Sequence, residues 1–391
     1  MTRQPTLLRG LTIWDGHAYL PADSLRLAGN RIAAIGDGLA PRRGERVITC
    51  GGATAMPGLM DAHVHLELDP EHGRPPALTD LRDPAAMARR AQRMVEAGIT
   101  TARDLGGGTG AELALRNRID AGETAGPRLL CAGQPVTRPG GHCHFWGGEA
   151  ADLDAARQVI RRQVARGVDL IKVMATGGMF TRASDPAAAQ FDQETLAGIV
   201  VEAAQHGLAV AAHCHGTRGI EYAARAGVRT IEHCSWMGRD GWAGNYEEAV
   251  ARVILEQGVW VSPTVNRGWQ RYLDAPDPTK LQRIRRAFQA MEALGIPFVA
   301  STDAGIPGVH PHHLPEALSV FARVAERTPG DVLRSATSTA AEALGIAADT
   351  GRLAPGMRAD VLLVDGDPLA NLAALTRPVG VWADGRACLL P

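Results

Sequence analysis

The sequence lacks the features that would send a chain to or across a membrane. Its first ten residues, MTRQPTLLRG, hold only Leu7 and Leu8 as an apolar pair, so they do not resemble the apolar core of a secretory signal peptide. No apolar run approaches the roughly 18 residues that a membrane-spanning helix needs. We therefore expect a cytoplasmic protein without a membrane partner.

Paired cysteines are also missing. The six cysteines are Cys50, Cys131, Cys143, Cys214, Cys234 and Cys388. They are scattered and form no C-x-x-C pair, which excludes a disulfide framework and a structural zinc knuckle. A reducing compartment is the simplest expectation.

The chain carries no long basic run, and its charges balance. Lysine and arginine number 41, aspartate and glutamate number 42, and the net charge is −1. This balance argues against a nucleic-acid partner and favours a small-molecule substrate. With 391 residues, 45% of them hydrophobic, the chain can bury one large domain and a small one. Assembly into a homo-oligomer is compatible with this composition.

Both ends of the sequence have the character of short strands. LLRGLTIWDG and SLRLAGNRIAAIGDG at the start, and MRADVLLVDGDP and VGVWADGRACLL at the end, are apolar segments broken by Gly, Asp and Pro. Neither end has helical periodicity. We therefore predict one small β-sandwich domain built from residues 1–56 and 349–391, with two unrelated β extensions as the alternative.

The middle of the chain alternates strands and helices. The predicted strands are the eight apolar segments 54–66, 98–105, 127–133, 168–175, 208–215, 228–234, 259–265 and 296–305. The second of them begins with Gly98, and five others directly follow a glycine, at positions 167, 207, 227, 258 and 295; glycine is typical of a helix C-terminus. Eight strand–helix units over about 250 residues predict an α/β fold of the (β/α)8 TIM-barrel type for residues 57–348. An open doubly wound sheet is the rival, but a Gly-rich dinucleotide fingerprint is missing.

Histidines end the first predicted strand. His63 and His65 are two residues apart, so in a strand their side chains point the same way. Because barrel chemistry lies at the carboxyl ends of the strands, both imidazoles could bind one metal ion there. On its own, this pair could equally be two surface histidines of an edge strand.

A lysine lies in the fourth predicted strand. Lys172 stands in the apolar run DLIKVMA, where a bare ammonium group would be costly to bury. Either it pairs with a carboxylate, or its amine is carboxylated to an anion that bridges two metal ions.

Three later strands also end in ligand residues. The fifth strand offers His213 and His215 on one face and Cys214 on the other, the sixth offers His233, and the eighth offers Asp303. A lone buried histidine is usually a packing residue, but this series after the first pair favours a metal site. By strand alternation, Cys214 and Cys234 should face the surrounding helices.

These residues together resemble the binuclear amidohydrolase superfamily. The motifs KVMATGGM, AHCHG, IEHCSW and STDAG resemble its imidazolonepropionase-like and Xaa-Pro dipeptidase group, and the opening PGLMDAHVHL and the tail GRLAPGMRADVLLVDGDP resemble its β domain. The dipeptidases often have tyrosine where this chain has His215, so the role of His215 is open. Mononuclear deaminases of the superfamily lack the bridging lysine, so Lys172 argues against deamination.

The resemblance implies a set of roles for these side chains. His63 and His65 would hold the buried metal with Asp303, His213 and His233 the exposed one, and N6-carboxylated Lys172 would bridge them. Zinc suits these ligands, with manganese, cobalt and iron as alternatives.

The chemistry that follows is amide hydrolysis by a metal-bridging hydroxide, with Asp303 moving the proton. His142, His144 and His215 are the candidates for stabilising the oxyanion. Cys143, between two of these histidines, could instead be a nucleophile, but that alternative leaves the ligand series unexplained.

Loops after the strands should select the substrate. The candidate substrate residues are Arg138, Arg182, Arg267, Trp146 and Trp236, with Trp269 and the rim histidines His310, His312 and His313 nearby. An arginine in such a loop could receive a carboxylate through two hydrogen bonds.

The leading hypothesis is therefore hydrolysis of a C–N bond in a dipeptide or an N-acyl amino acid. A cyclic amide, a carbamate or urea, an ester or a phosphotriester are alternative substrates. A non-catalytic assembly protein on the same scaffold is the alternative from another class, and it would be expected to have lost ligands.

Overall fold

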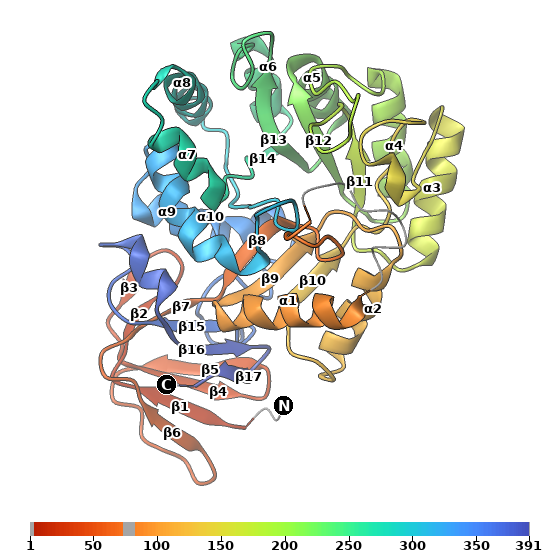
Figure 1. Cartoon of the computed structure of the whole chain (residues 1–391). Coiled ribbons are helices and arrows are strands. Elements are labelled where there is room, and N and C mark those ends of the chain that lie inside the picture. Colours follow the sequence, from red (N-terminus) through yellow and green to blue (C-terminus); the bar gives the residue numbers. More distant parts are fainter. Residues whose placement is uncertain (1–3, 73–82, 391) are drawn as a thin grey trace.

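The computed structural model describes residues 4–72 and 83–390 (Figure 1). Strands from the two ends of the sequence lie together on one side of the molecule, and alternating strands and helices form the rest. The remaining positions, 1–3, 73–82 and 391, fall within the predicted segments 1–56, 57–348 and 349–391 but lie outside the described residues.

One terminal sheet has the strand order β5-β4-β1-β6. Its strands are β1 (Thr6–Arg9), β4 (Ser24–Ala28), β5 (Arg31–Gly36) and β6 (Arg46–Thr49). The antiparallel hairpin of β4 and β5 turns at Gly29 and Asn30, the turn signal in the sequence. Gly29 has φ +59, a left-handed conformation that glycine adopts without strain.

The second terminal sheet joins the two ends of the chain. Its order is β17-β16-β15-β7-β2-β3. The strands are β2 (Thr12–Trp14), β3 (Tyr19–Leu20), β7 (Thr54–Pro57), β15 (Val361–Val364), β16 (Pro378–Ala383) and β17 (Arg386–Leu389). Pro57 of β7 lies opposite Val361 of β15 in an antiparallel pair. Leu8 and Leu25 of the first sheet share a buried core with Ile13, Val361 and Trp382 of the second, so the sheets face each other.

The middle of the chain forms parallel strands covered by helices. They are β8 (Leu59–Val64), β9 (Ile99–Asp104) and β10 (Arg128–Cys131), ordered β10-β9-β8, and β11 (Ile171–Met174), β12 (Val210–Gly216), β13 (Thr230–Met237) and β14 (Trp260–Ser262), in sequence order. Every residue of β8 and of β12 is buried, as expected for parallel strands covered on both faces. The first predicted strand, 54–66, is in fact split at Gly58 into β7, which belongs to the terminal sheet, and β8, which pairs with β9. A side chain at Gly58 would collide with Thr100.

Hydrogen bonds connect these two parallel sheets. The Val136 amide donates to the Lys172 carbonyl, and the Met174 amide donates to the Val136 carbonyl. On the other side, the segment after Ile296 lies between β14 and β8, with isolated bridges from Phe298 to Val261 and from Ala304 to Val64.

The eighth predicted strand is wrong in its detail. Segment 296–305 contains no continuous strand. Side chains occupy several of its hydrogen-bonding positions: Asp61 accepts from the Thr302 amide, and the Ser301 hydroxyl accepts from the Thr264 amide. Asp303 then turns into the left-handed region with φ +59. Regular strand pairing is therefore interrupted in the segment that carries Asp303.

Helices lie outside the parallel strands (Figure 1). They are α1 (Pro84–Glu96), α2 (Ala111–Asp120), α3 (Leu153–Ala165), α4 (Gln193–Gln205), α5 (Thr217–Ala226), α6 (Glu248–Glu256), α7 (Gln270–Leu273), α8 (Thr279–Ala293), α9 (Leu314–Ala325), α10 (Pro329–Ser335) and α11 (Ser338–Ala343). The short 3-10 helices are η1 (His144–Trp146), η2 (Arg267–Trp269), η3 (Pro311–His313) and η4 (Leu372–Thr376).

The glycines predicted to end helices are confirmed in that role. Gly98, Gly167, Gly207, Gly227, Gly258 and Gly295 all have φ between +63 and +87. Among the described helices, none combines the length and the apolar character that crossing a membrane requires.

Candidate metal centre and its cavity

One cluster of potential ligands joins the end of β8 to the segment before Ala304. Nε2 of His63 lies 3.2 Å from Nε2 of His65 and 3.2 Å from Oδ1 of Asp303, and the His65 nitrogen lies 3.3 Å from the same oxygen. The prediction that the two imidazoles point the same way is confirmed. Two nitrogens and a carboxylate oxygen at these separations fit around one divalent cation.

The far side of each imidazole is held by an acceptor. Nδ1 of His63 lies 2.9 Å from Oε2 of Glu232, and Nδ1 of His65 lies 3.0 Å from the Gly106 carbonyl oxygen. A proton on each Nδ1 leaves each Nε2 with a free lone pair toward Asp303. Burial, followed by the nearby cations, holds the pKa of His63 well below its usual range, so the ring is a neutral ligand.

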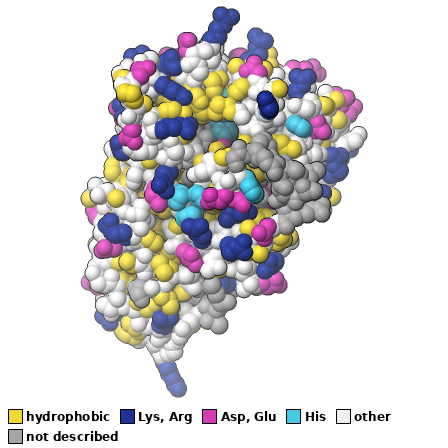
Figure 2. Space-filling view, in the orientation of Figure 1, with side chains coloured by type: hydrophobic (Ala, Val, Ile, Leu, Met, Phe, Trp, Pro, Cys, Tyr) yellow, Lys and Arg dark blue, Asp and Glu magenta, His cyan; other side chains and the backbone are white. Residues whose placement is uncertain are grey.

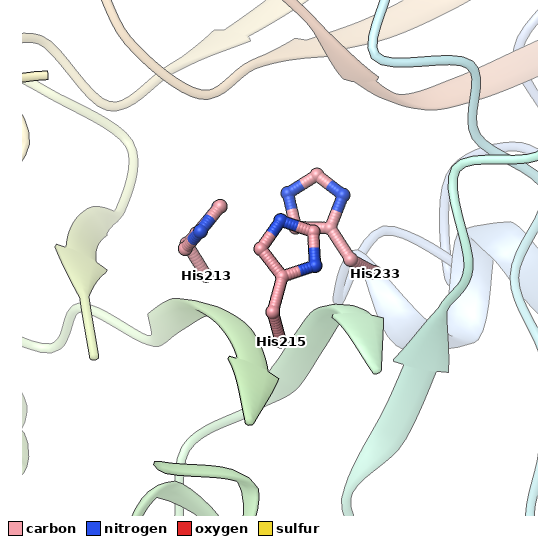
Figure 3. Close-up of side chains that lie close together, drawn as sticks. All are labelled: His213, His215 and His233. Carbon is pink, nitrogen blue, oxygen red and sulfur yellow. The ribbon is translucent and has the colours of Figure 1, made fainter. Parts of the chain in front are cut away.

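The second cluster consists of His213 and His215 on β12 and His233 on β13 (Figure 3). Their rings face one another, with centroids 4.5–4.7 Å apart. Burial lowers the pKa of all three imidazoles, to about 3 for His215, so they too are neutral. The ring of His233 is 5.2 Å from that of His63, which brings the two clusters together.

Hydrogen bonds also select the free nitrogen in this second cluster. Nε2 of His213 lies 2.9 Å from the Gly177 carbonyl oxygen, which leaves Nδ1 free. Nδ1 of His215 is bonded to Ser235 Oγ and Nδ1 of His233 to Thr264 Oγ1, both at 2.8 Å, which leaves the Nε2 atoms free. Each ring therefore has one anchored nitrogen and one that can bind a cation.

Lys172 lines the same cavity and is 1% exposed. Its Nζ atom has no hydrogen-bond partner among the described residues. Burial lowers its pKa to about 8, although Glu232 and Asp303 oppose this shift. No carboxylate within residues 4–72 and 83–390 lies within ion-pair distance of Nζ, so the ion-pair alternative has no partner there. An orphaned buried amine beside two neutral ligand clusters fits a carboxylated, metal-bridging lysine.

Several residues of the site have a left-handed backbone. His233, Cys234 and Asp303 have φ of +66, +44 and +59. Such conformations cost about 1–3 kcal/mol each in residues other than glycine, and they concentrate at functional sites. The backbone at these positions therefore turns the side chains of His233 and Asp303 toward the cavity.

Glu232 is a residue that the sequence reasoning missed. It is fully buried, and its second oxygen, Oε1, accepts a 2.7 Å hydrogen bond from Arg103 Nη2. The Arg103 pair holds the Glu232 carboxylate in place beside Nδ1 of His63.

Replacing Glu232 by glutamine is expected to weaken metal binding about 10- to 100-fold, because a neutral amide oxygen is a weaker acceptor for His63 than a carboxylate. Competition with a chromogenic chelator measures the affinity, and a thermal melt reports whether the variant folds. Glu248→Gln is the matched control, since Glu248 is exposed on α6 and pairs with Arg252. Unchanged affinity in folded Glu232→Gln protein would contradict this role.

A cavity of about 490 Å³ opens above both clusters. Figure 2 shows the hollow in this face, with a histidine at depth and hydrophobic side chains beside it. The lining contains all the predicted ligands, together with His142, Trp146 and Trp269 among the other predicted residues.

Other predicted residues do not line this cavity. His144 is exposed, and so are Arg138, Arg182 and Arg267. Trp236 is buried against a neighbouring apolar void, which it shares with Cys234. The histidines His310, His312 and His313 form a surface group whose ring centroids lie 4.2–5.6 Å apart. The lining also includes four residues that the sequence reasoning did not select: Trp242 and Phe180 in loops, Met174 at the end of β11, and Arg271 in α7.

Cys143 lines the cavity, but its surroundings do not activate it. Its backbone amide donates a 2.8 Å hydrogen bond to Thr181 Oγ1. Burial raises the pKa of the thiol, which disfavours the thiolate. Cys214 and Cys234 face outward as predicted: the Cys214 thiol donates to Gly219 of α5, and Cys234 shares an apolar void with Phe288 of α8.

Replacing Cys143 by alanine is expected to leave kcat within about threefold of the parent value, because no base is positioned to form the thiolate. Steady-state kinetics with metal-loaded protein provides the test, with Cys388→Ala as the control. A loss of more than about 100-fold at full metal content would restore the nucleophile alternative.

Comparison with known proteins shows the family to which the chain belongs. A family model described as the amidohydrolase family matches residues 54–388. The ochratoxinase of Aspergillus niger is 29% identical over 373 residues, covering 85% of this chain and 75% of its own. The imidazolonepropionase of Paracoccus denitrificans (strain Pd 1222) is 29% identical over 194 residues, covering 49% of this chain and 43% of its own.

A solved structure extends the likeness to the whole fold. A Xaa-Pro dipeptidase with methionine bound in its active site superposes with a TM-score of 0.84 at 25% identity, covering 98% of this chain and 99% of that one. The resemblance inferred from the motifs is thus confirmed, and the fold is of the TIM-barrel α/β type. Because the family model spans most of the sequence, this chain belongs to the amidohydrolase family and is a hydrolase acting on carbon–nitrogen bonds.

Proposed function

We propose that the protein is a binuclear metal-dependent hydrolase that cleaves the amide bond of a dipeptide or an N-acyl amino acid. One observation carries the proposal: two clusters of neutral ligands meet in one cavity beside Lys172, whose buried amine has no partner among the described residues. A non-catalytic scaffold protein would have no need to keep both clusters.

His63, His65 and Asp303 would hold one ion, and His213 and His233 the other, with carboxylated Lys172 between them. His215 is close enough to its two neighbours to be a further ligand. Imidazole and carboxylate donors suit zinc. When bound, two divalent cations supply acidity to a water molecule and polarise the scissile carbonyl.

The protein's own groups then act on the proton and the oxyanion. Asp303 accepts the proton of the attacking water and passes it to the leaving nitrogen. His142 is the better candidate for stabilising the oxyanion, because its ring lines the cavity 4.5 Å from that of His213, whereas His144 is exposed. His215 is the second candidate.

The choice of substrate rests on the relatives and on the cavity. Ochratoxinase and the Xaa-Pro dipeptidase are two of the relatives that match most of the chain, over 85% and 98% of it. An apolar cavity with few charged groups suits an acylated amino acid. Cyclic amides, carbamates, ureas, esters and phosphotriesters are the alternatives, because the same site would activate water against each of them.

We also propose the domain division made from the sequence. Residues 57–348 would form the TIM barrel, with segment 296–305 in the place of its eighth strand, and 1–56 with 349–391 a β-sandwich. The sheet that pairs β7 with β15 and the core shared by the two terminal sheets support this division. Six unpaired cysteines support a cytoplasmic location.

The test is a screen of N-acyl amino acids, Xaa-Pro dipeptides, lactams and carbamates with zinc-, manganese- and cobalt-loaded protein. We expect about two metal ions per chain and amide hydrolysis that a chelator abolishes. Protein that holds less than about one ion per chain and cleaves no amide would favour the scaffold alternative.

A further inference from the structure

A row of aromatic rings leads from the histidine cluster to the mouth of the cavity. The ring of Trp242 lies 5.7 Å from His215, that of Trp269 lies 5.0 Å from Trp242, and that of Tyr272 lies 5.4 Å from Trp269. Trp242 and Trp269 line the cavity itself. Such rings are a binding surface for a large apolar group.

The rest of the lining is mainly apolar. It includes Leu68, Met174, Phe180, Ile306 and Val309. A substrate bound between these residues and the two tryptophans would bury an aromatic or branched side chain of its own. We therefore expect the cavity to favour substrates with a large apolar group over substrates with a small polar one.

Arg271 lies at the outer end of the aromatic row and lines the cavity. Its Nη2 donates to the Tyr272 hydroxyl at 2.9 Å, and its guanidinium lies 4.8 Å from the centre of that ring. Lys280 contacts the same ring at 4.3 Å. Within the part of the chain that the structure describes, no carboxylate forms an ion pair with Arg271, and it is the only arginine of the lining.

The charges of the lining therefore divide into two places. Asp303, the only described carboxylate of the cavity, and Lys172 belong to the candidate metal centre, whereas Arg271 is an exposed cation without an ion-pair partner among the described residues. A guanidinium held on a ring presents its remaining N–H groups in a fixed orientation, which suits a carboxylate. The predicted Arg138, Arg182 and Arg267 do not line the cavity.

We propose that Arg271 binds the free carboxylate of the substrate's amino-acid part while Trp242 and Trp269 receive its large apolar side chain. The substrate class is then N-acyl derivatives of large apolar amino acids with a free α-carboxylate. This inference rests on the proposed amide hydrolysis and names which amides are cleaved.

A matched pair of substrates isolates the carboxylate. N-Benzoyl-L-phenylalanine and N-benzoylphenethylamine have the same amide and the same phenyl ring, and only the first has the carboxylate. We expect Arg271→Gln to lower kcat/KM for the acid about 10- to 100-fold, mainly through KM, and to leave the phenethylamine substrate unaffected. Arg271→Lys should retain part of the activity toward the acid. Arg286→Gln, at an exposed position of α8, should behave like the parent protein.

Calorimetric binding of both compounds to the Asp303→Asn protein gives a readout independent of turnover. There the acid should bind about tenfold more tightly than the phenethylamine compound, and Arg271→Gln should remove the difference. Amide hydrolysis with equal preference for both compounds, unchanged by Arg271→Gln, overturns this inference and leaves the proposed function standing. Absence of hydrolysis of every amide, together with a carboxylate preference in binding, overturns the proposed function and keeps the role of Arg271.

Discussion

Replacing Asp303 by asparagine is expected to lower kcat by about two to four orders of magnitude while the fold is retained. Asp303 is the only carboxylate among the described residues that line the cavity, and Oδ1 lies within 3.3 Å of both His63 and His65. Asparagine keeps an oxygen that can contact a cation, but its amide cannot accept the proton of the attacking water. Asparagine also tolerates the left-handed conformation at this position, where φ is +59, so the backbone need not change.

Metal content must be measured together with kcat, because Asp303 is both a proposed ligand and the proposed proton carrier. Asp303→Ala should lose the cation of the first cluster, whereas Asp303→Asn should keep it and still lose turnover. Asp277→Asn, on an exposed loop beside Thr279, is the control for changing an aspartate elsewhere. If Asp303→Asn retains both metals and loses less than about tenfold in kcat, proton transfer belongs to another group.

The ligand set could be predicted from the sequence because it follows local rules. His63 and His65 are two positions apart, as are His213 and His215, so each pair falls on one face of a strand. Glycines after the helices marked where the next strands begin, and each has the positive φ that this role requires. These features depend on neighbours in the sequence and not on the rest of the fold.

Glu232 could not be found in this way, because the strand departs from alternation at that point. Thr230 and Glu232 point inward together, with their side chains hydrogen bonded to each other and to Arg103. Alternation would then send His233 outward. The left-handed backbone at His233 turns it inward as well, so adjacent residues serve one site. A sequence pattern does not reveal such a change in backbone conformation.

The cavity lining depends on contacts between distant loops, which a single sequence does not specify. Arg267 was a candidate because it follows the seventh strand closely, but the short helices η2 and α7 expose it and bring Arg271 to the cavity. The prediction of the eighth strand was wrong for a related reason, because the side chains of Asp61 and Ser301 take part of its backbone hydrogen bonding. Long-range contacts of this kind decide selectivity more than they decide the metal centre.

Replacing Lys172 by alanine is expected to abolish the binuclear centre and to lower kcat by about 100-fold or more, because the proposed bridge between the two clusters is lost. Lys172→Met is the second variant, since it keeps the volume of this buried side chain without the amine and so guards against a packing defect. The metal content should fall from about two ions per chain to about one or fewer in both variants. The melting temperature is recorded for each variant.

The bridge itself can be observed directly, because Lys280 is the only other lysine of the sequence. A carbamate forms when the uncharged amine attacks carbon dioxide, making one N–C bond and releasing one proton to solvent. Burial lowers the Lys172 pKa to about 8, so the uncharged amine is accessible at mildly alkaline pH, and no described carboxylate pairs with it. Protein loaded with metal in ¹³C-bicarbonate should therefore show one carbamate carbon signal, absent from Lys172→Ala and retained in Lys280→Ala. Full turnover with both ions still bound in Lys172→Ala would exclude a carbamate bridge and leave the two histidine clusters as separate metal sites.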